Sequence, residues 1–138
     1  LVQLAGAMAA AWFFHLLYGE TKTFFAAPAA GINVIKPLLV EAVFTFALAS
    51  VVLHVATSEK TAGNHYYGIA IGFTVLAAAF AGGPISGGAY NPAVGAGPIL
   101  VDTLLGGNSI SHLWLYLAGP FAGGLAAALV YKMTATEG

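Results

Sequence analysis

The chain has 138 residues, of which 59% are hydrophobic and only 7% are charged, and its formal net charge is −1. Soluble domains carry about a quarter charged residues, so this composition indicates a membrane protein. The balanced charge argues against nucleic acid as a partner. The absence of cysteine excludes disulfides and thiolate metal sites, and the histidines show no metal-ligand spacing, so we expect no metal and no cofactor.

Four apolar stretches are long enough to cross a hydrocarbon core, which needs about 20 helical residues. We predict spans over residues 1–18, 37–57, 66–81 and 111–133, with a polar, Pro- and Gly-containing connector between the first two. Because the chain opens inside apolar sequence, we expect it to be the C-terminal part of a longer protein. Lysines fall on both sides of the spans, so the positive-inside rule gives no orientation.

A segment without charge joins the third and fourth spans, and it contains a glycine-rich run followed by Asn91-Pro92-Ala93. Asn is a preferred helix N-cap and Pro is favoured at the first helical position. We therefore predict a re-entrant loop and a short helix over residues 82–105. A helix of about 20 Å reaches only part-way through a bilayer, and irregular backbone at that depth is tolerated where it lines a cavity or is buried in protein. This geometry favours a pore.

The segment from Gly87 to Pro98, GGAYNPAVGAGP, resembles the second signature loop of the aquaporin and glycerol-facilitator (major intrinsic protein) family. Other segments are similar to the third to sixth helices of that family, in order: Gln3–Ala7, Glu41 with Thr45, Gly68–Phe73, and His112–Tyr116 with Gly119–Gly124. The resemblance covers nearly all of the chain. It implies an all-α membrane protein, an aquaporin-like helical bundle with a re-entrant half-helix. This chain would hold the second inverted repeat and the helix before it.

The resemblance implies a passive channel for water or small uncharged solutes such as glycerol, urea or ammonia, and no enzymatic activity. It also implies a homotetramer in the lipid bilayer, and we expect a multi-pass protein of the cell membrane. The Asn91 amide would donate a hydrogen bond to a permeating water, and loop carbonyls would accept hydrogen bonds along one pore wall. The pore residues implied in this way are Gly87, Gly88, Ala89, Tyr90, Asn91, Pro92 and Ala93.

The positions that align with the family's narrow filter are small or apolar. Val94 stands where the family usually has arginine, and the filter positions on the fifth helix and in the loop align with Ala79 and Gly88. The resemblance therefore implies a filter that is wider and less polar than that of a strict water channel. Exclusion of protons and cations would then depend mainly on the helix dipoles.

Glu41 is an ionisable group in the middle of a predicted span, where a charge is costly and usually functional. We expect it to accept hydrogen bonds from the backbone of the re-entrant loop, with Gln3 beside it. Direct contact of Glu41 with the solute is the alternative. For His112, we expect a structural hydrogen bond. Small residues in the last span are expected to allow close contacts between helices.

Three other functions stay open at the level of the sequence. One repeat cannot close the channel, so the chain is either half of a pore or a non-conducting scaffold or truncated product. Two copies inserted in opposite orientations form a second possibility. The loss of the arginine allows a third, a channel that leaks protons or cations. The sequence fixes neither the physiological solute nor gating.

Overall fold

The computed structural model describes residues 1–19 and 24–134, so part of the predicted connector lies outside the described residues. The α-helices are α1 (Val2–Tyr18), α2 (Ile35–Val52), α3 (Tyr67–Ser86), α4 (Pro92–Leu104) and α5 (Leu113–Thr134). A π-helical turn, η2 (Leu53–Thr57), continues α2, and a 3-10 turn, η3 (Glu59–Thr61), follows it. Another 3-10 turn, η4 (Ser109–His112), leads into α5.

Among the described residues, three helical segments are long and apolar enough to cross a membrane: Ile35–Thr57, Tyr67–Ser86 and Ser109–Thr134. They make the protein an integral, multi-pass membrane protein. The first predicted span is the shorter helix α1, which has 17 residues. The helix α4 has 13 residues. At a rise of about 1.5 Å per residue, the length of α4 is roughly two thirds of the thickness of a hydrocarbon core, which is about 30 Å.

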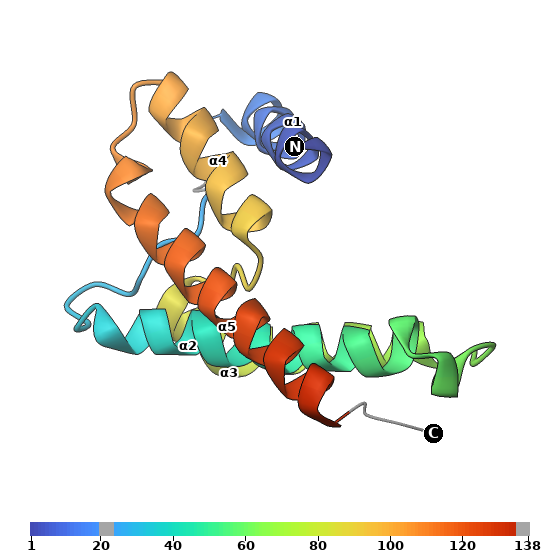
Figure 1. Cartoon of the computed structure of the whole chain (residues 1–138). Coiled ribbons are helices and arrows are strands. Elements are labelled where there is room, and N and C mark those ends of the chain that lie inside the picture. Colours follow the sequence, from blue (N-terminus) through green and yellow to red (C-terminus); the bar gives the residue numbers. More distant parts are fainter. Residues whose placement is uncertain (20–23, 135–138) are drawn as a thin grey trace.

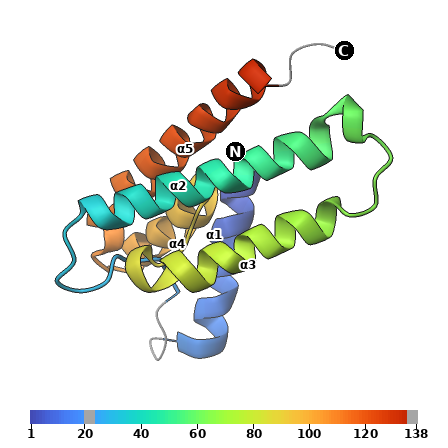
Figure 2. The ribbon, with the colours of Figure 1, turned by 90° about the horizontal axis from the view of Figure 1, so that it is seen from below.

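The helices are arranged around α2 and α4. The helices α2 and α3 run side by side in opposite directions, and α5 crosses α2 (Figures 1 and 2). The helix α4 packs against α5, and α1 packs across α4. Of the described α-helices, α1 contacts α4 alone. The loop that precedes α4 therefore lies where the α2–α3 pair meets the other helices.

The helix α3 continues to Ser86, whereas the sequence predicted the span to end near Ala81 and the loop to begin at the next residue. That expectation depended on Gly82-Gly83-Pro84, because Gly is a weak helix former and Pro lacks the backbone N–H. Tertiary packing outweighs this local preference. A Cβ on the first of these glycines would lie 2.5 Å from the hydroxyl oxygen of Tyr90, so the glycine lets that side chain reach the helix.

Glycines also set the distances at which the other helices cross. A Cβ at Gly97 would lie 2.5 Å from the Cβ of Ala7, where α4 meets α1. A Cβ at Gly123 would overlap the carbonyl oxygen of Ala42, where α5 crosses α2. Around Gly124, the next residue of α5, there is open space. Close contact through small residues is therefore confirmed for one face of α5 and does not extend to all of its glycines.

Candidate functional site

The loop between α3 and α4 is held in place by a carboxylate from α2. Glu41 is completely buried, and its Oε1 accepts a hydrogen bond from the backbone N–H of Ala89 at 3.0 Å. Its Oε2 accepts one from the backbone N–H of Tyr90 at 2.6 Å. The carboxylate therefore faces the loop backbone.

Two further buried side chains support the same loop, and the sequence did not identify either of them. The hydroxyl of Ser86 donates to Glu41 Oε1 at 2.7 Å and accepts from the N–H of Gly88 at 3.1 Å. The hydroxyl of Tyr116 donates to the carbonyl oxygen of Ser86. A serine at a span end and a tyrosine inside a span are common residues, so only their spatial relation to Glu41 marks them.

The backbone N–H groups of the loop differ from its carbonyl groups in their hydrogen bonding. Each N–H from Gly87 to Tyr90 donates to a partner in the protein, in order the carbonyl of Gly83, Ser86 and the two carboxylate oxygens of Glu41. The carbonyl oxygens of the same loop residues accept no hydrogen bond from any residue that the structure describes. Of these residues, Ala89 and Tyr90 are buried, Gly88 is half-buried and Gly87 is exposed. The loop therefore presents a row of unoccupied acceptors.

The backbone of this loop is left-handed at Gly87, Gly88 and Tyr90. Tyr90 has a φ of +49°, and it is the only described residue other than glycine with a positive φ. For a residue with a side chain this conformation costs about 1–2 kcal/mol. The Tyr90 hydroxyl donates to the carbonyl of Ala78 at 2.8 Å, and its ring makes an edge contact with Phe44 at 5.5 Å. These contacts hold the residue in the strained conformation.

The short helix α4 begins as the sequence predicted. Asn91 is the N-cap, in an extended conformation, and Pro92 is the first helical residue. The Oδ1 of Asn91 accepts a hydrogen bond from the N–H of Ala93 at 2.9 Å. Because the capping atom must be an acceptor, the Nδ2 amino group points away, and it donates to no described residue. Asn91 therefore offers a free donor at the positive end of the helix dipole.

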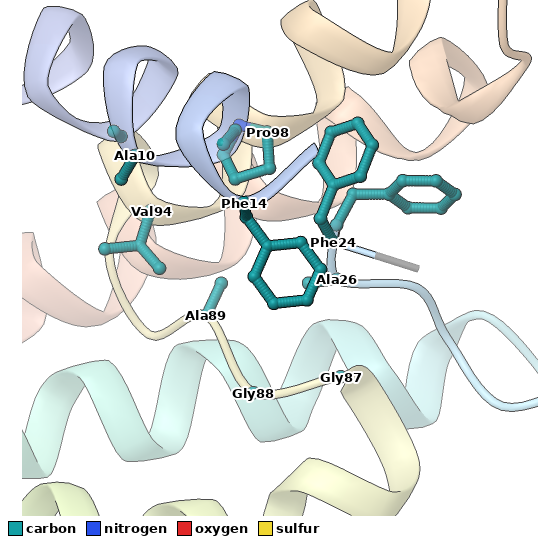
Figure 3. Close-up of a pocket in the computed structure, with 12 residues that line it drawn as sticks. Ala10, Phe14, Phe24, Ala26, Gly87, Gly88, Ala89, Val94 and Pro98 are labelled. Carbon is teal, nitrogen blue, oxygen red and sulfur yellow. The ribbon is translucent and has the colours of Figure 1, made fainter. Parts of the chain in front are cut away.

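Hollows lie on two sides of this loop. The Val94 groove, about 550 Å³, lies between α1, the connector and the loop (Figure 3). Its lining residues are Ala7, Ala10, Ala11, Phe14, Phe24, Phe25, Ala26, Gly87, Gly88, Ala89, Val94 and Pro98. The Asn91 groove, about 410 Å³, lies between α2, α5 and the start of α4. It is lined by Thr45, Leu48, Ala49, Tyr90, Asn91, Pro92, Pro120, Phe121, Gly124 and Leu125.

The structure thus separates the residues that the sequence grouped as one pore. Gly88 and Val94, two of the aligned filter positions, line the Val94 groove together. The third, Ala79, is exposed on α3 and lines neither groove. Asn91 and Pro92 line the Asn91 groove, on the other side of the loop.

Two of the expected supporting residues lie elsewhere. Gln3 is not beside Glu41: it is exposed on α1, which packs against α4 and not against α2. His112 is half-buried in η4, and its side chain forms no hydrogen bond with a described residue. A spacing within one helix fixes the face on which a residue lies. It does not determine which helix packs against that face.

Three helices long and apolar enough to cross a membrane, together with a shorter helix that begins at Asn91-Pro92, define a helical membrane protein. The chain matches the model of the family described as "Major intrinsic protein" over residues 1–131. It belongs to that family.

Among curated proteins, the chain is similar to Aquaporin NIP1-4 of Oryza sativa subsp. japonica, at 36% identity over 138 residues, 100% of this chain and 48% of that protein. It is also similar to a probable aquaporin NIP-type of Nicotiana alata, at 36% identity over 134 residues, 96% of this chain and 47% of the relative. Probable aquaporin TIP2-2 of Arabidopsis thaliana is 40% identical over 104 residues, 75% of this chain and 40% of the relative. The chain spans about half the length of the first two relatives.

Proposed function

We propose that this chain forms one half of a passive transmembrane channel for water and small uncharged solutes. The observation that carries the proposal is the contrast within the loop, where every N–H from Gly87 to Tyr90 has a partner and the carbonyls have none among the described residues. Unpaired carbonyls at membrane depth need hydrogen-bond donors, and a file of water or hydroxyl-bearing solute supplies them. The names of the relatives agree with this function.

Asn91 supplies the complementary group at the end of the row of carbonyls. Its Oδ1 is occupied by the cap to Ala93, so the amide can offer only its Nδ2–H to a passing oxygen. The N-terminal end of α4 carries a partial positive charge that favours the same orientation of a water molecule. A water that donates to the loop carbonyls and then accepts from Asn91 must rotate as it moves. A rotation of this kind interrupts a proton-conducting chain of hydrogen bonds.

Val94 makes the filter wider and less polar than an arginine would. It is 50% exposed, and it lies in one groove with Gly88, which has no side chain. We propose that the channel admits glycerol, urea or ammonia beside water. Because no cationic side chain stands at this position, a leak of protons or cations is the second candidate function.

The test is to reconstitute the full-length protein that carries this sequence in liposomes and to measure water, glycerol, urea and proton fluxes separately. We expect water and at least one neutral solute to cross faster than in empty liposomes. No flux above that of empty liposomes would favour a non-conducting scaffold. Proton flux that rises with water flux would favour the leaky channel.

The substitution Asn91→Asp keeps the N-cap of α4 and removes the Nδ2 hydrogen-bond donor, so it tests the donor alone. Asp is as good an N-cap as Asn and suits the positive end of a helix, so α4 and the thermal stability should be preserved. The substitution replaces the amide donor by a charged acceptor, so we expect lower water permeability and a measurable cation uptake. Unchanged water permeability in a stable Asn91→Asp protein would contradict the role of the Nδ2 group.

A homotetramer with one pore in each subunit, which the family resemblance implies, is part of the same proposal. Many large apolar side chains remain exposed on the described helices, among them Phe73, Phe80 and Leu129. In a membrane, such faces meet either lipid or other subunits. The mass of the detergent-solubilised protein, corrected for bound detergent, distinguishes a tetramer from a monomer.

A further inference from the structure

The side chain of Tyr90 extends from the loop before α4 and contacts both α2 and α3. Its hydroxyl donates a hydrogen bond to the carbonyl of Ala78, in the middle of α3, at 2.8 Å. Its ring makes an edge contact with Phe44 of α2, at a centroid distance of 5.5 Å and an interplanar angle of 62°. Tyr90 is only 3% exposed, and buried tyrosine hydroxyls usually have a hydrogen-bond partner. The side chain therefore links the loop to both helices of the α2–α3 pair.

The face of α3 that meets this side chain is made of small residues. The buried residues of α3 are Ala78, Gly82 and Ser86, which are spaced four apart and so share one face of the helix. A Cβ at Gly82 would lie 2.5 Å from the hydroxyl oxygen of Tyr90 and 2.6 Å from the Cγ1 of Val40. A methyl group at this position would therefore press on the tyrosine hydroxyl where it meets the helix.

Two helices hold Tyr90 at opposite ends of the residue. Its backbone N–H donates to Oε2 of Glu41, on α2, at 2.6 Å, and its hydroxyl reaches α3. Between these two points the φ angle is +49°, a left-handed conformation that is unfavourable for a residue with a side chain. Of the described α-helices, α3 packs against α2 and not against α4 or α5. The hydroxyl bond is therefore a direct tie between the loop and the body of α3.

The position of the Asn91 amide depends on the backbone of Tyr90, because Asn91 is the next residue. Its Oδ1 accepts from the N–H of Ala93, and its Nδ2 donates to no described residue. Tyr90 and Asn91 both line the Asn91 groove. Without the hydroxyl bond, the strained backbone of Tyr90 loses one restraint, and relaxation toward a negative φ would rotate the peptide that joins it to Asn91. The hydroxyl bond therefore acts on the place of the free Nδ2 donor.

We propose that Tyr90 is a positioning residue of the channel, whose hydroxyl bond to α3 fixes the place of the Asn91 amide in the Asn91 groove. The inference rests on the proposed function and adds a residue that acts through Asn91, without touching the solute. Loss of the hydroxyl displaces the donor that turns a passing water, so the chain of waters is interrupted less completely. Proton permeability then rises relative to water permeability. Partial unfolding or poor insertion would instead lower both permeabilities together and leave their ratio unchanged.

The experiment compares Tyr90→Phe with Tyr66→Phe in the full-length protein that carries this sequence, reconstituted in liposomes. Tyr66→Phe is the matched control, because it removes the same hydroxyl from a tyrosine that is 51% exposed at the N-cap of α3. The readout is the ratio of proton to water permeability. We expect this ratio to rise several-fold in Tyr90→Phe and to stay at the wild-type value in Tyr66→Phe. An unchanged or lower ratio in Tyr90→Phe, or an equal rise in both variants, overturns the inference.

Tyr90→Phe is also measured in a protein that carries Asn91→Asp and therefore lacks the amide donor. Because Tyr90 acts through that donor, the added substitution should leave the ratio of the Asn91→Asp protein unchanged. A rise as large as the one in the wild-type background would mean that the hydroxyl acts without Asn91, which overturns the positioning role.

Gly82→Ala keeps the experiment decisive if Tyr90→Phe does not reach the membrane. Its methyl group meets the Tyr90 hydroxyl, whereas a methyl group at Gly72, also on α3, meets nothing within 4 Å. The ratio of proton to water permeability should rise in Gly82→Ala and stay at the wild-type value in Gly72→Ala, and an unchanged ratio in Gly82→Ala overturns the inference.

The wild-type measurement distinguishes the two proposals. If the wild type conducts neither water nor solute, the proposed function fails. If the wild type conducts water and the variants at Tyr90 and Gly82 leave the ratio unchanged, the positioning role of Tyr90 alone fails.

Discussion

Glu41 and Tyr90 are 49 positions apart in the chain, and a 2.6 Å hydrogen bond joins the carboxylate of one to the backbone N–H of the other. This bond lies inside the helix bundle, where both groups have lost contact with water. It connects α2, a membrane span, to the loop between α3 and α4, which has little secondary structure of its own. The Glu41 carboxylate therefore holds the two consecutive N–H groups of Ala89 and Tyr90, beside the support that Ser86 and Tyr116 give to the same loop.

Glu41→Gln should destabilise the protein by about 1–3 kcal/mol, because one of the two loop N–H groups loses its acceptor and faces an amino group instead. We expect a lower melting temperature in detergent and a loss of water permeability. Glu59→Gln is the matched control, since Glu59 is exposed in η3. Equal melting temperatures for Glu41→Gln and the wild type would show that the loop holds its conformation without the carboxylate.

Gly87→Ala tests whether contact with the connector fixes the loop. Gly87 has a φ of +86°, and a Cβ there would meet the backbone of Ala27. Gly106 has a φ of +90° but open space around it, so Gly106→Ala carries only the backbone strain, about 1–2 kcal/mol. Gly87→Ala should lose more stability than Gly106→Ala, and it alone should lose water permeability. Equal losses of stability in thermal unfolding would indicate that backbone strain alone matters at Gly87.

The sequence predicted the elements whose signals are local. Asn91-Pro92 marks the start of α4 because a cap and a first-turn proline act within a few residues. Glu41 stands out because a carboxylate inside a span needs partners. The continuation of α3 through Gly82-Gly83-Pro84 could not be predicted, because it depends on packing against the side chain of Tyr90.

The sequence did not identify some residues of the site, because their positions depend on how distant segments of the chain pack together. Ser86 and Tyr116 belong to the site only because α3, α2 and α5 converge there, and neither residue type signals this. The connector reads as polar, and its contact with the loop, between Ala27 and Gly87, depends on how the helices place the two backbones. Gln3 is expected beside Glu41, but α1, which carries Gln3, packs on α4 and not on α2.

Gly123→Ala and Gly124→Ala are adjacent substitutions in α5 with opposite expected effects. The new methyl group at Gly123 would overlap the Ala42 carbonyl of α2, and overpacking of this kind costs about 1–3 kcal/mol. At Gly124 the methyl group meets nothing, and alanine favours the helix by about 0.5–1 kcal/mol. Thermal unfolding should therefore rank the proteins Gly124→Ala, wild type, Gly123→Ala, from most to least stable. The reverse order would mean that α5 crosses α2 through another face.

Val94→Arg restores the side chain that the family usually has at this position, and it tests the filter directly. Arginine would extend into a groove whose other wall carries Phe14 and Phe24, and a guanidinium group is attracted to the face of an aromatic ring. We expect lower glycerol permeability and, from the added positive charge, less cation leak.

Val94→Met distinguishes the effect of side-chain size from that of side-chain charge in the same experiment, because methionine is long but neutral. It should lower glycerol permeability without reducing the cation leak. Both variants are compared with the wild type in liposomes, with water permeability as the measure of active protein. Glycerol permeability that is unchanged in Val94→Arg would place Val94 outside the solute path. An equal reduction of the cation leak by both variants would show that the width of the filter, and not the charge of the arginine, excludes cations here.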